Sequence, residues 1–197
     1  GGIRESWMTG AFATGLVAGV LVLYDRLLHI GGLSGTVTTA QTVGGTLTRN
    51  TTGVGNFVFA EIYTAIGATA TTITMSYTDQ SGTAGNTSTA VTFGGTTANT
   101  VTRAVFLPLA SGDTGVQAVA SVTVLATTGT AGNFGVTIGE PLAYLPIGIA
   151  GAAGWRDFVT GLPSIPKIEA NSCLSLLWFP QTTTAPEIFG GYSIVEA

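Results

Sequence analysis

Charged side chains are scarce in this 197-residue chain. Six Lys and Arg and ten Asp and Glu make up 8% of the residues, whereas a soluble domain usually carries about a quarter. The six basic residues are scattered along the sequence, so they form no stripe that could follow a phosphate backbone. The composition therefore argues against nucleic acid as a direct partner.

Histidine and cysteine are nearly absent as well. The single cysteine, Cys173, excludes an intrachain disulfide and a cysteine-based metal cluster. His29 is the only histidine, and the sequence has neither a P-loop nor a dinucleotide-binding glycine motif between a strand and a helix. We therefore expect no bound metal and no cofactor.

A run long enough to span a membrane is missing too. The uncharged apolar stretch 11–24 has fourteen residues, and a spanning helix needs about 20. We expect no membrane partner, and we treat residues 1–23 as an N-terminal arm or first strand that precedes a single β-sandwich domain over 24–197. Because the first residue is Gly1 and not Met, we also expect an upstream segment that was removed or omitted.

Threonine and glycine dominate instead, with thirty-four and twenty-nine residues. They lie within alternating segments, of which 72–78 is the clearest, because Ile73, Met75 and Tyr77 would share one face of a strand. Similar alternation predicts further strands at 36–43, 55–63, 100–107, 121–127 and 134–138. The apolar run 174–179 predicts a strand buried on both faces, and 192–195 predicts a last strand.

The pentapeptide Gly-Thr-Ala-Gly-Asn occurs at 82–86 and again at 129–133. Each copy lies between two alternating segments, which predicts two β-hairpin loops whose glycines adopt positive φ. Duplication of one hairpin and convergence on a favourable turn are both open as its origin.

Two segments predict short helices. Residues 154–162 place Trp155, Phe158, Val159 and Leu162 at the spacing of an amphipathic helix that Pro163 ends. Residues 24–29 could form one helical turn. With these exceptions the pattern predicts an all-β fold, either a jelly roll or a two-sheet β-sandwich with one or two short helices.

Catalytic candidates are few. On a helical turn, His29 could contact Asp25, four residues earlier, but a partly buried histidine beside a turn is the favoured interpretation. We interpret Cys173 as a packed thiol before an apolar strand, and Asp79 and Asp113 as turn residues. We therefore predict no catalytic site and no enzyme activity.

The predicted helix at 154–162 carries the candidate interface residues Trp155, Arg156 and Phe158. Trp155 is also a better interface candidate than the nearby aromatic residues Trp178 and Phe179, because those two fall on the strand predicted to be buried. Tryptophan and arginine are enriched where proteins contact one another.

Three stretches resemble virion structural proteins of tailed bacteriophages. They are 106–116, 162–168 leading into Cys173, and 24–28 together with the strand predicted at 36–43. The resemblance implies an abundant, repeated, non-enzymatic particle component, such as the small β-rich capsid decoration or cement proteins that bind as trimers. Members of the group carry a longer N-terminal region than this chain has before Trp7.

These features together lead to a primary hypothesis and two alternatives. We expect a capsid decoration protein on the virion exterior that self-associates, as a trimer, and contacts the major capsid protein. Apolar and threonine-rich faces would make those contacts, because uncharged contacts resist salt. The alternatives are a tail or receptor- or carbohydrate-binding β module, and a main shell subunit.

Overall fold

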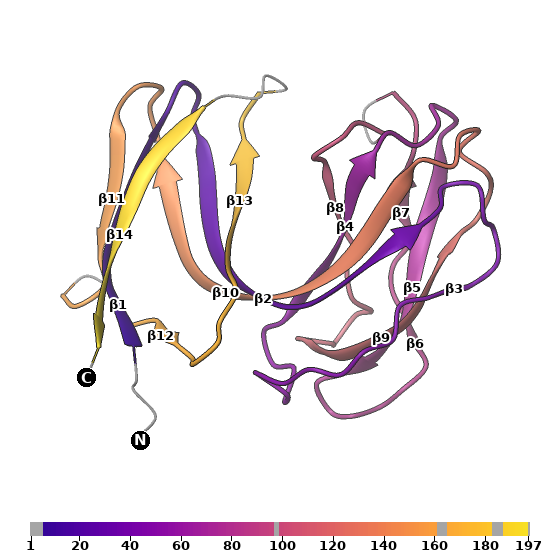
Figure 1. Cartoon of the computed structure of the whole chain (residues 1–197), viewed down its shortest axis with the longest axis horizontal. Coiled ribbons are helices and arrows are strands. Elements are labelled where there is room, and N and C mark those ends of the chain that lie inside the picture. The colour runs from indigo at the N-terminus through magenta and orange to yellow at the C-terminus, as the bar shows by residue number, and fades with distance from the viewer. Residues whose placement is uncertain (1–5, 97–98, 161–164, 183–186, 197) are drawn as a thin grey trace. The chain divides into compact units, whose positions relative to one another are not determined.

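The computed structural model describes residues 6–96, 99–160, 165–182 and 187–196, and within them the chain is all-β (Figure 1). No helix occurs in these ranges. The strands are β1 (Ser6–Gly15), β2 (Gly19–Leu33), β3 (Gln41–Thr42), β4 (Phe57–Thr64), β5 (Thr71–Asp79), β6 (Asn86–Thr87), β7 (Val91–Phe93), β8 (Ala104–Phe106), β9 (Val116–Val124), β10 (Asn133–Ile147), β11 (Ala153–Asp157), β12 (Lys167–Ile168), β13 (Leu174–Pro180) and β14 (Ile188–Glu196).

The chain divides into two compact units. Unit 1 combines Gly1–Asp25 with Pro141–Ala197, and unit 2 is the continuous segment Arg26–Glu140. The two long strands β2 and β10 contribute residues to both units. The sequence predicted a single domain after residue 23, whereas the structure joins the N-terminal strands to the C-terminal third of the chain.

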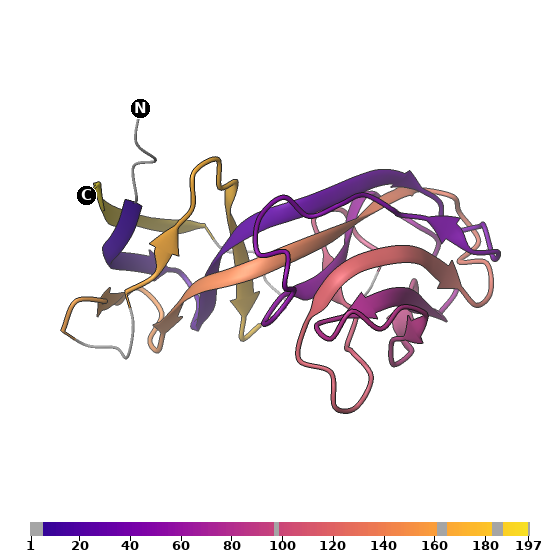
Figure 2. The ribbon, with the colours of Figure 1, turned by 90° about the horizontal axis from the view of Figure 1, so that it is seen from below.

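Unit 2 is a two-layer β-sandwich, seen from two directions in Figures 1 and 2. One layer contains β4 and β8 with the adjoining parts of β2 and β10, and the other contains β3, β9, β5, β6 and β7. Both layers are antiparallel, as in the pairs β4–β10 and β5–β9. The β-sandwich predicted from the sequence is therefore confirmed.

The core of unit 2 lies between these layers and follows the predicted alternation. Ile73, Met75 and Tyr77 of β5 are buried, whereas Thr74 and Ser76 between them are partly exposed. Val58, Ala60 and Ile62 of β4 belong to the same core cluster, together with Phe93 and Phe134. The rings of Phe93 and Phe134 pack edge to face with centroids 4.9 Å apart, a favoured arrangement for aromatic pairs.

The first copy of the repeated pentapeptide forms the predicted hairpin, between β5 and β6. Gly82 and Gly85 have φ of 82° and 83°, a region that glycine enters without steric cost. The buried carboxylate of Asp79 accepts hydrogen bonds from the N–H groups of Ser81 (2.7 Å) and Thr83 (2.9 Å). The interpretation of Asp79 as a turn residue is confirmed.

The second copy is not a hairpin loop, so that prediction is wrong. It connects β9 to β10, which belong to different layers of unit 2. Thr128, fully buried just before it, places its hydroxyl 3.0 Å from the Gly35 carbonyl oxygen and 3.1 Å from the Gly67 nitrogen. These long-range bonds hold the segment against two other loops, and the position equivalent to Asp79 is Ala126.

The strand predicted at 36–43 is reduced to the two residues of β3. The Gln41 side chain accepts a hydrogen bond from the Ser34 N–H at 2.8 Å and donates one to the Ser34 carbonyl at 2.9 Å. Such local side-chain bonds offer the backbone an alternative to sheet pairing.

Unit 1 contains a sheet in which β1 is central. β11 and β12 pair with β1, and β14 also pairs with it along nearly its whole length. β13 pairs separately with the Gly19–Asp25 part of β2. Two small groups of buried residues fill unit 1: Met8, Leu23, Ala143, Phe158 and Ile168 form one, and Ala13, Leu21, Leu145 and Ile147 form the other.

The helix predicted at 154–162 is absent, because its first residues form β11. Trp155 pairs with Phe12 of β1, and the Asp157 carboxylate accepts a hydrogen bond from the Val159 N–H at 2.8 Å, which turns the chain. A nine-residue helix is also too short to be stable alone. Leu162 and Pro163 lie outside the described residues.

Two further predictions about unit 1 are corrected. The helical turn predicted at 24–29 is part of the extended strand β2, whose residues Tyr24 and Asp25 pair with β13. The strand predicted at 174–179 exists as β13, but it is not buried on both faces, since Leu176 is 57% exposed and Phe179 is 41% exposed. Within the described ranges β13 pairs only with β2, so it is an edge strand.

Candidate functional site

Exposed large apolar side chains gather in unit 1. Of the seventeen such residues in the described ranges, thirteen belong to unit 1: Phe12, Leu16, Tyr144, Ile149, Trp155, Val159, Ile165, Leu176, Phe179, Phe189, Tyr192, Ile194 and Val195. Single exposed apolar residues are ordinary, whereas a concentration of them indicates an interaction surface. Unit 1 is therefore the candidate functional part of the chain.

Aromatic side chains form a row across the sheet around β1. Phe12 lies opposite Trp155 of β11 on one side and opposite Gly191 of β14 on the other. Gly191 leaves room for the Phe12 ring, because a Cβ there would lie 3.1 Å from Phe12 Cε1. Phe189, two residues from Gly191, shares this face by the alternation of the strand and is 63% exposed.

The three predicted interface residues occupy different environments. Trp155 is 74% exposed. Arg156 is partly buried, and Phe158 is 1% exposed in the core of unit 1. Phe158 is therefore a packing residue, and the predicted helix that carried the three candidates is replaced by strand β11 and the turn after it. A role for Trp155 in contacting a partner stays a prediction.

An apolar cavity of about 280 Å³ lies within unit 1. Its lining comes from β1, β2, β10, β13 and β14 and includes Leu21, Leu145, Leu176, Trp178 and Tyr192. Leu176 and Tyr192 are more than half exposed, so the cavity opens to solvent beside β13 and β14. The Trp178 Nε1 atom is buried and has no hydrogen-bond partner among the described residues. The packing of unit 1 is thus incomplete on this side.

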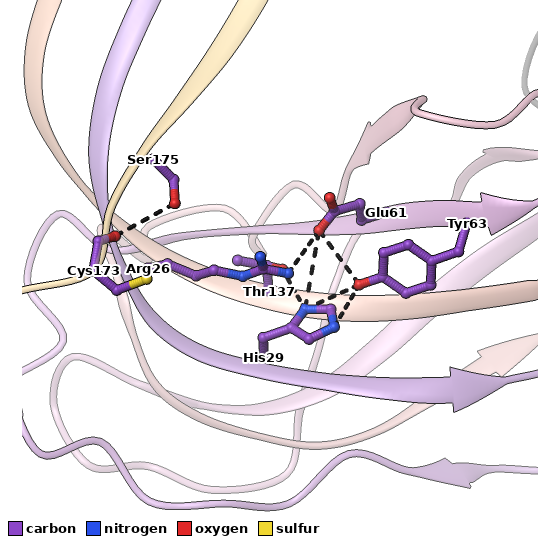
Figure 3. A network of polar contacts seen from close by, with 7 residues as sticks. All are labelled: Arg26, His29, Glu61, Tyr63, Thr137, Cys173 and Ser175. Atoms are coloured by element: carbon purple, nitrogen blue, oxygen red, sulfur yellow. Dashed lines mark hydrogen bonds and ion pairs between the residues drawn. The ribbon is translucent and has the colours of Figure 1, made fainter.

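A polar network in unit 2 surrounds the only histidine (Figure 3). His29 Nδ1 lies 2.8 Å from Thr137 Oγ1, and the Tyr63 hydroxyl contacts His29 Nε2. The Glu61 carboxylate accepts a hydrogen bond from Arg26 at 2.9 Å and lies 4.0 Å from His29 Nδ1. β2, β4 and β10 supply these five residues.

The environment of His29 favours its neutral form. Burial lowers the pKa of His29 below its ordinary value of 6.5, the nearby Arg26 charge lowers it further, and Glu61 opposes both. Burial raises the pKa of the Tyr63 hydroxyl above 10.0, and the Glu61 charge raises it further. A neutral imidazole has one donor and one acceptor nitrogen, and both nitrogens here already have partners.

This network suits a structural role better than a catalytic one. A catalytic histidine would activate a nucleophile, and the hydroxyl that bonds to His29 is that of Thr137. Thr137 is fully buried, so a substrate could not reach it. The contact suggested by sequence between His29 and Asp25 is not made. The Asp25 carboxylate instead accepts a hydrogen bond from the Cys173 N–H at 2.7 Å.

The network was missed because its members are far apart in sequence. Glu61 and Tyr63 alternate with the core residues Ala60 and Ile62 in β4. A glutamate within an otherwise apolar strand needs a partner when it is partly buried. That signal could have indicated a buried polar contact, although not which cation makes it.

Two other predicted positions differ in their contacts. Cys173 is exposed, so the interpretation as a packed thiol is wrong; its carbonyl lies 3.4 Å from the Ser175 hydroxyl (Figure 3). The side chain of Asp113 accepts a hydrogen bond from the Tyr77 hydroxyl instead of its own backbone. Asp113 still lies in a turn, because its N–H donates to the Ala110 carbonyl at 3.2 Å.

The described ranges contain no group of three metal-ligating side chains. They also hold no helix with the length and apolarity that a membrane span requires. No protein-family model matches the chain, no curated protein matches its sequence, and no solved structure matches its fold. The resemblance to tailed-phage virion proteins stays a prediction.

Proposed function

We propose that this protein is a structural component of a bacteriophage particle, a capsid decoration protein that associates with copies of itself and stabilises the head shell. The concentration of exposed apolar side chains in unit 1 carries this proposal. A monomer that exposes large apolar patches tends to aggregate, whereas an assembly covers them. The sequence resemblance to virion proteins points to a particle as the assembly.

The distribution of residue types suits two units with different tasks. Twenty-eight of the thirty-four threonines lie in unit 2, where a polar, weakly charged surface can remain in water. Unit 1 has six threonines and most of the exposed apolar side chains. We assign self-association and attachment to the shell to unit 1. Unit 2 would remain exposed to water.

The copy number of the chain in purified particles tests this proposal. Quantitative mass spectrometry should give a number comparable to that of the shell subunit. A handful of copies would indicate a tail component, and a shell that cannot form without the chain would indicate the main shell subunit. Particles that lack the chain should assemble but release their genome at a lower temperature. Unchanged release would contradict a stabilising role.

A carbohydrate-binding role is the second candidate, because Trp155 and Phe12 are exposed aromatic residues at opposite positions of neighbouring strands. Aromatic faces stack against the apolar faces of sugar rings, and such platforms often carry binding. Glycan-array binding that disappears in Trp155→Ala but persists in Leu125→Ala would favour this function. Leu125 is a suitable control because it is 75% exposed in unit 2.

A further inference from the structure

β14 is an edge strand that lacks the usual protection. It pairs with β1 and with no other strand in the described part of the chain. An edge strand presents unpaired N–H and C=O groups, and natural proteins shield such edges with charged residues, proline or bulges. The segment 188–195 contains neither a charged residue nor a proline, and the register shift in its pairing with β1 lies between Met8 and Gly10, so the extra residue is in β1 and not in β14. It can therefore accept a further strand.

Exposed apolar side chains surround this edge. They form what we term the β14 surface, which has two faces: by the alternation of the strands Phe12, Phe189 and Val195 lie on one face of the sheet, and Tyr192 and Ile194 lie on the other, where Leu176 of β13 lines the cavity with Tyr192. Their exposed fractions range from 40% to 63%. Leu176 and Tyr192 also line the unit 1 cavity, so the surface continues into a recess within the same unit.

The size of the β14 surface matches that of an interface between subunits. Aromatic side chains present roughly 150–250 Å² when fully exposed and aliphatic ones less, so the six, about half exposed, offer on the order of 500 Å² of apolar area divided between the two faces of β14. A stable interface buries about 800 Å² per partner, of which about 65% is apolar in homodimers. The surface is therefore large enough to hold two protein subunits together.

The scarcity of charged residues in β1, β13 and β14 indicates which kind of partner would fit the β14 surface. β1, β13 and β14 together contain a single charged residue, Glu196, at the end of β14. Like charges opposite one another destabilise paired strands, and here the like charges that two copies would bring together are confined to Glu187 and Glu196 at the two ends of β14. A strongly charged partner would find no complementary group and would lose hydration of its own charges.

We propose that the β14 surface is the contact between copies of this chain, in which unit 1 of a second copy pairs with the β14 edge and covers the mouth of the unit 1 cavity. This inference rests on the self-association included in the proposed function. It assigns that association to one side of unit 1 and makes β14 the strand that extends across the interface.

Lysine substitutions test the assignment in solution. Phe189→Lys and Tyr192→Lys place a charge on the β14 surface at side chains that are already more than half exposed, so the fold should tolerate both. Each should weaken association by about tenfold or more in sedimentation equilibrium. Leu125→Lys, a matched change at an exposed residue of unit 2, should leave association unchanged.

Hydrogen exchange of the unaltered protein provides a measurement that needs no variant. Amide protons of 188–195 should exchange more slowly as protein concentration rises, because pairing at the edge protects them. Amide protons of the turn 80–85 in unit 2 should exchange at a rate that does not depend on concentration. Concentration-independent exchange throughout β14 would overturn the proposal.

The possible outcomes separate this inference from the proposed function. An oligomer that neither lysine variant weakens would place the contact elsewhere and overturn the inference alone. A monomer at all concentrations would overturn it too, and a bound apolar molecule or foreign protein recovered with that monomer would identify the true occupant. An oligomer that depends on β14 but is absent from particles would support the inference and contradict the capsid role.

Discussion

Phe12 of β1 lies directly opposite Trp155 of β11, and both side chains are more than half exposed. Even a cross-strand aromatic pair whose rings touch contributes only roughly 0.2–1 kcal/mol relative to an alanine pair. Such a contribution is small, whereas each of the two side chains leaves more than half of its surface exposed to water. The pair is thus better suited to meeting another molecule than to stabilising its own sheet.

Replacement of Trp155 and of Phe158 should have very different effects on stability. Trp155→Ala should change the free energy of unfolding of unit 1 by no more than about 0.5 kcal/mol, as for most surface substitutions. Phe158→Ala should lower it by about 3–5 kcal/mol, because it leaves a cavity in the core. Urea unfolding followed by tryptophan fluorescence isolates unit 1, since Trp7, Trp155 and Trp178 all lie there. Equal effects would contradict the burial assigned to these residues.

Self-association should survive high salt. The β14 surface is uncharged, and at about 1 M salt the screening length is about 3 Å, which weakens exposed ion pairs but not apolar contacts. Sedimentation in about 1 M NaCl should give the same oligomer as at low salt. Dissociation into monomers at high salt would point to assembly through the few charged groups.

Removal of the Asp79 carboxylate should destabilise unit 2. Asp79→Ala leaves the N–H groups of Ser81 and Thr83 without an acceptor, which should lower the free energy of unfolding by roughly 1–3 kcal/mol. Asn133→Ala is the matched control, because Asn133 ends the second pentapeptide and is exposed. It should change stability by less than about 0.5 kcal/mol. Circular dichroism during urea unfolding measures both.

Acid should weaken unit 2 through His29. The folded pKa lies below the ordinary value of 6.5, so the unfolded chain binds the proton more tightly. The stabilising effect of the neutral ring is present above pH 6.5 and is lost as the pH falls toward the lowered folded pKa. His29→Gln should remove this part of the pH dependence, as measured by urea unfolding at several pH values. Parallel profiles for the two proteins would contradict a buried neutral imidazole.

The fold class could be predicted because alternation is a local property. In β5, every second residue from Ile73 to Tyr77 is apolar, and the strand has one buried and one partly exposed face. The turn at Asp79 was equally predictable, since its carboxylate bonds to N–H groups only two and four residues later. Contacts between residues that are only a few positions apart can be predicted from the local sequence.

Long-range pairing explains what could not be predicted. Residues 154–157 match a helical spacing but pair with Gly10–Ala13, far away in sequence, and sheet pairing decided their structure. His29 contacts Thr137 across more than a hundred residues, so no local pattern indicates the network. The second pentapeptide keeps its glycines at positive φ, but buried Thr128 ties the loop to Gly35 and Gly67.

The division of the chain sets an order of events during synthesis. Unit 2 is a continuous segment, so all its internal pairings can form once Glu140 has left the ribosome. Unit 1 must wait, because within the described residues β1 pairs with β11, β12 and β14, all of which follow unit 2 in the sequence. Until then the apolar strand β1 has no sheet to join. The proposed contact through β14 would therefore form only after β14 has been made, long after β1.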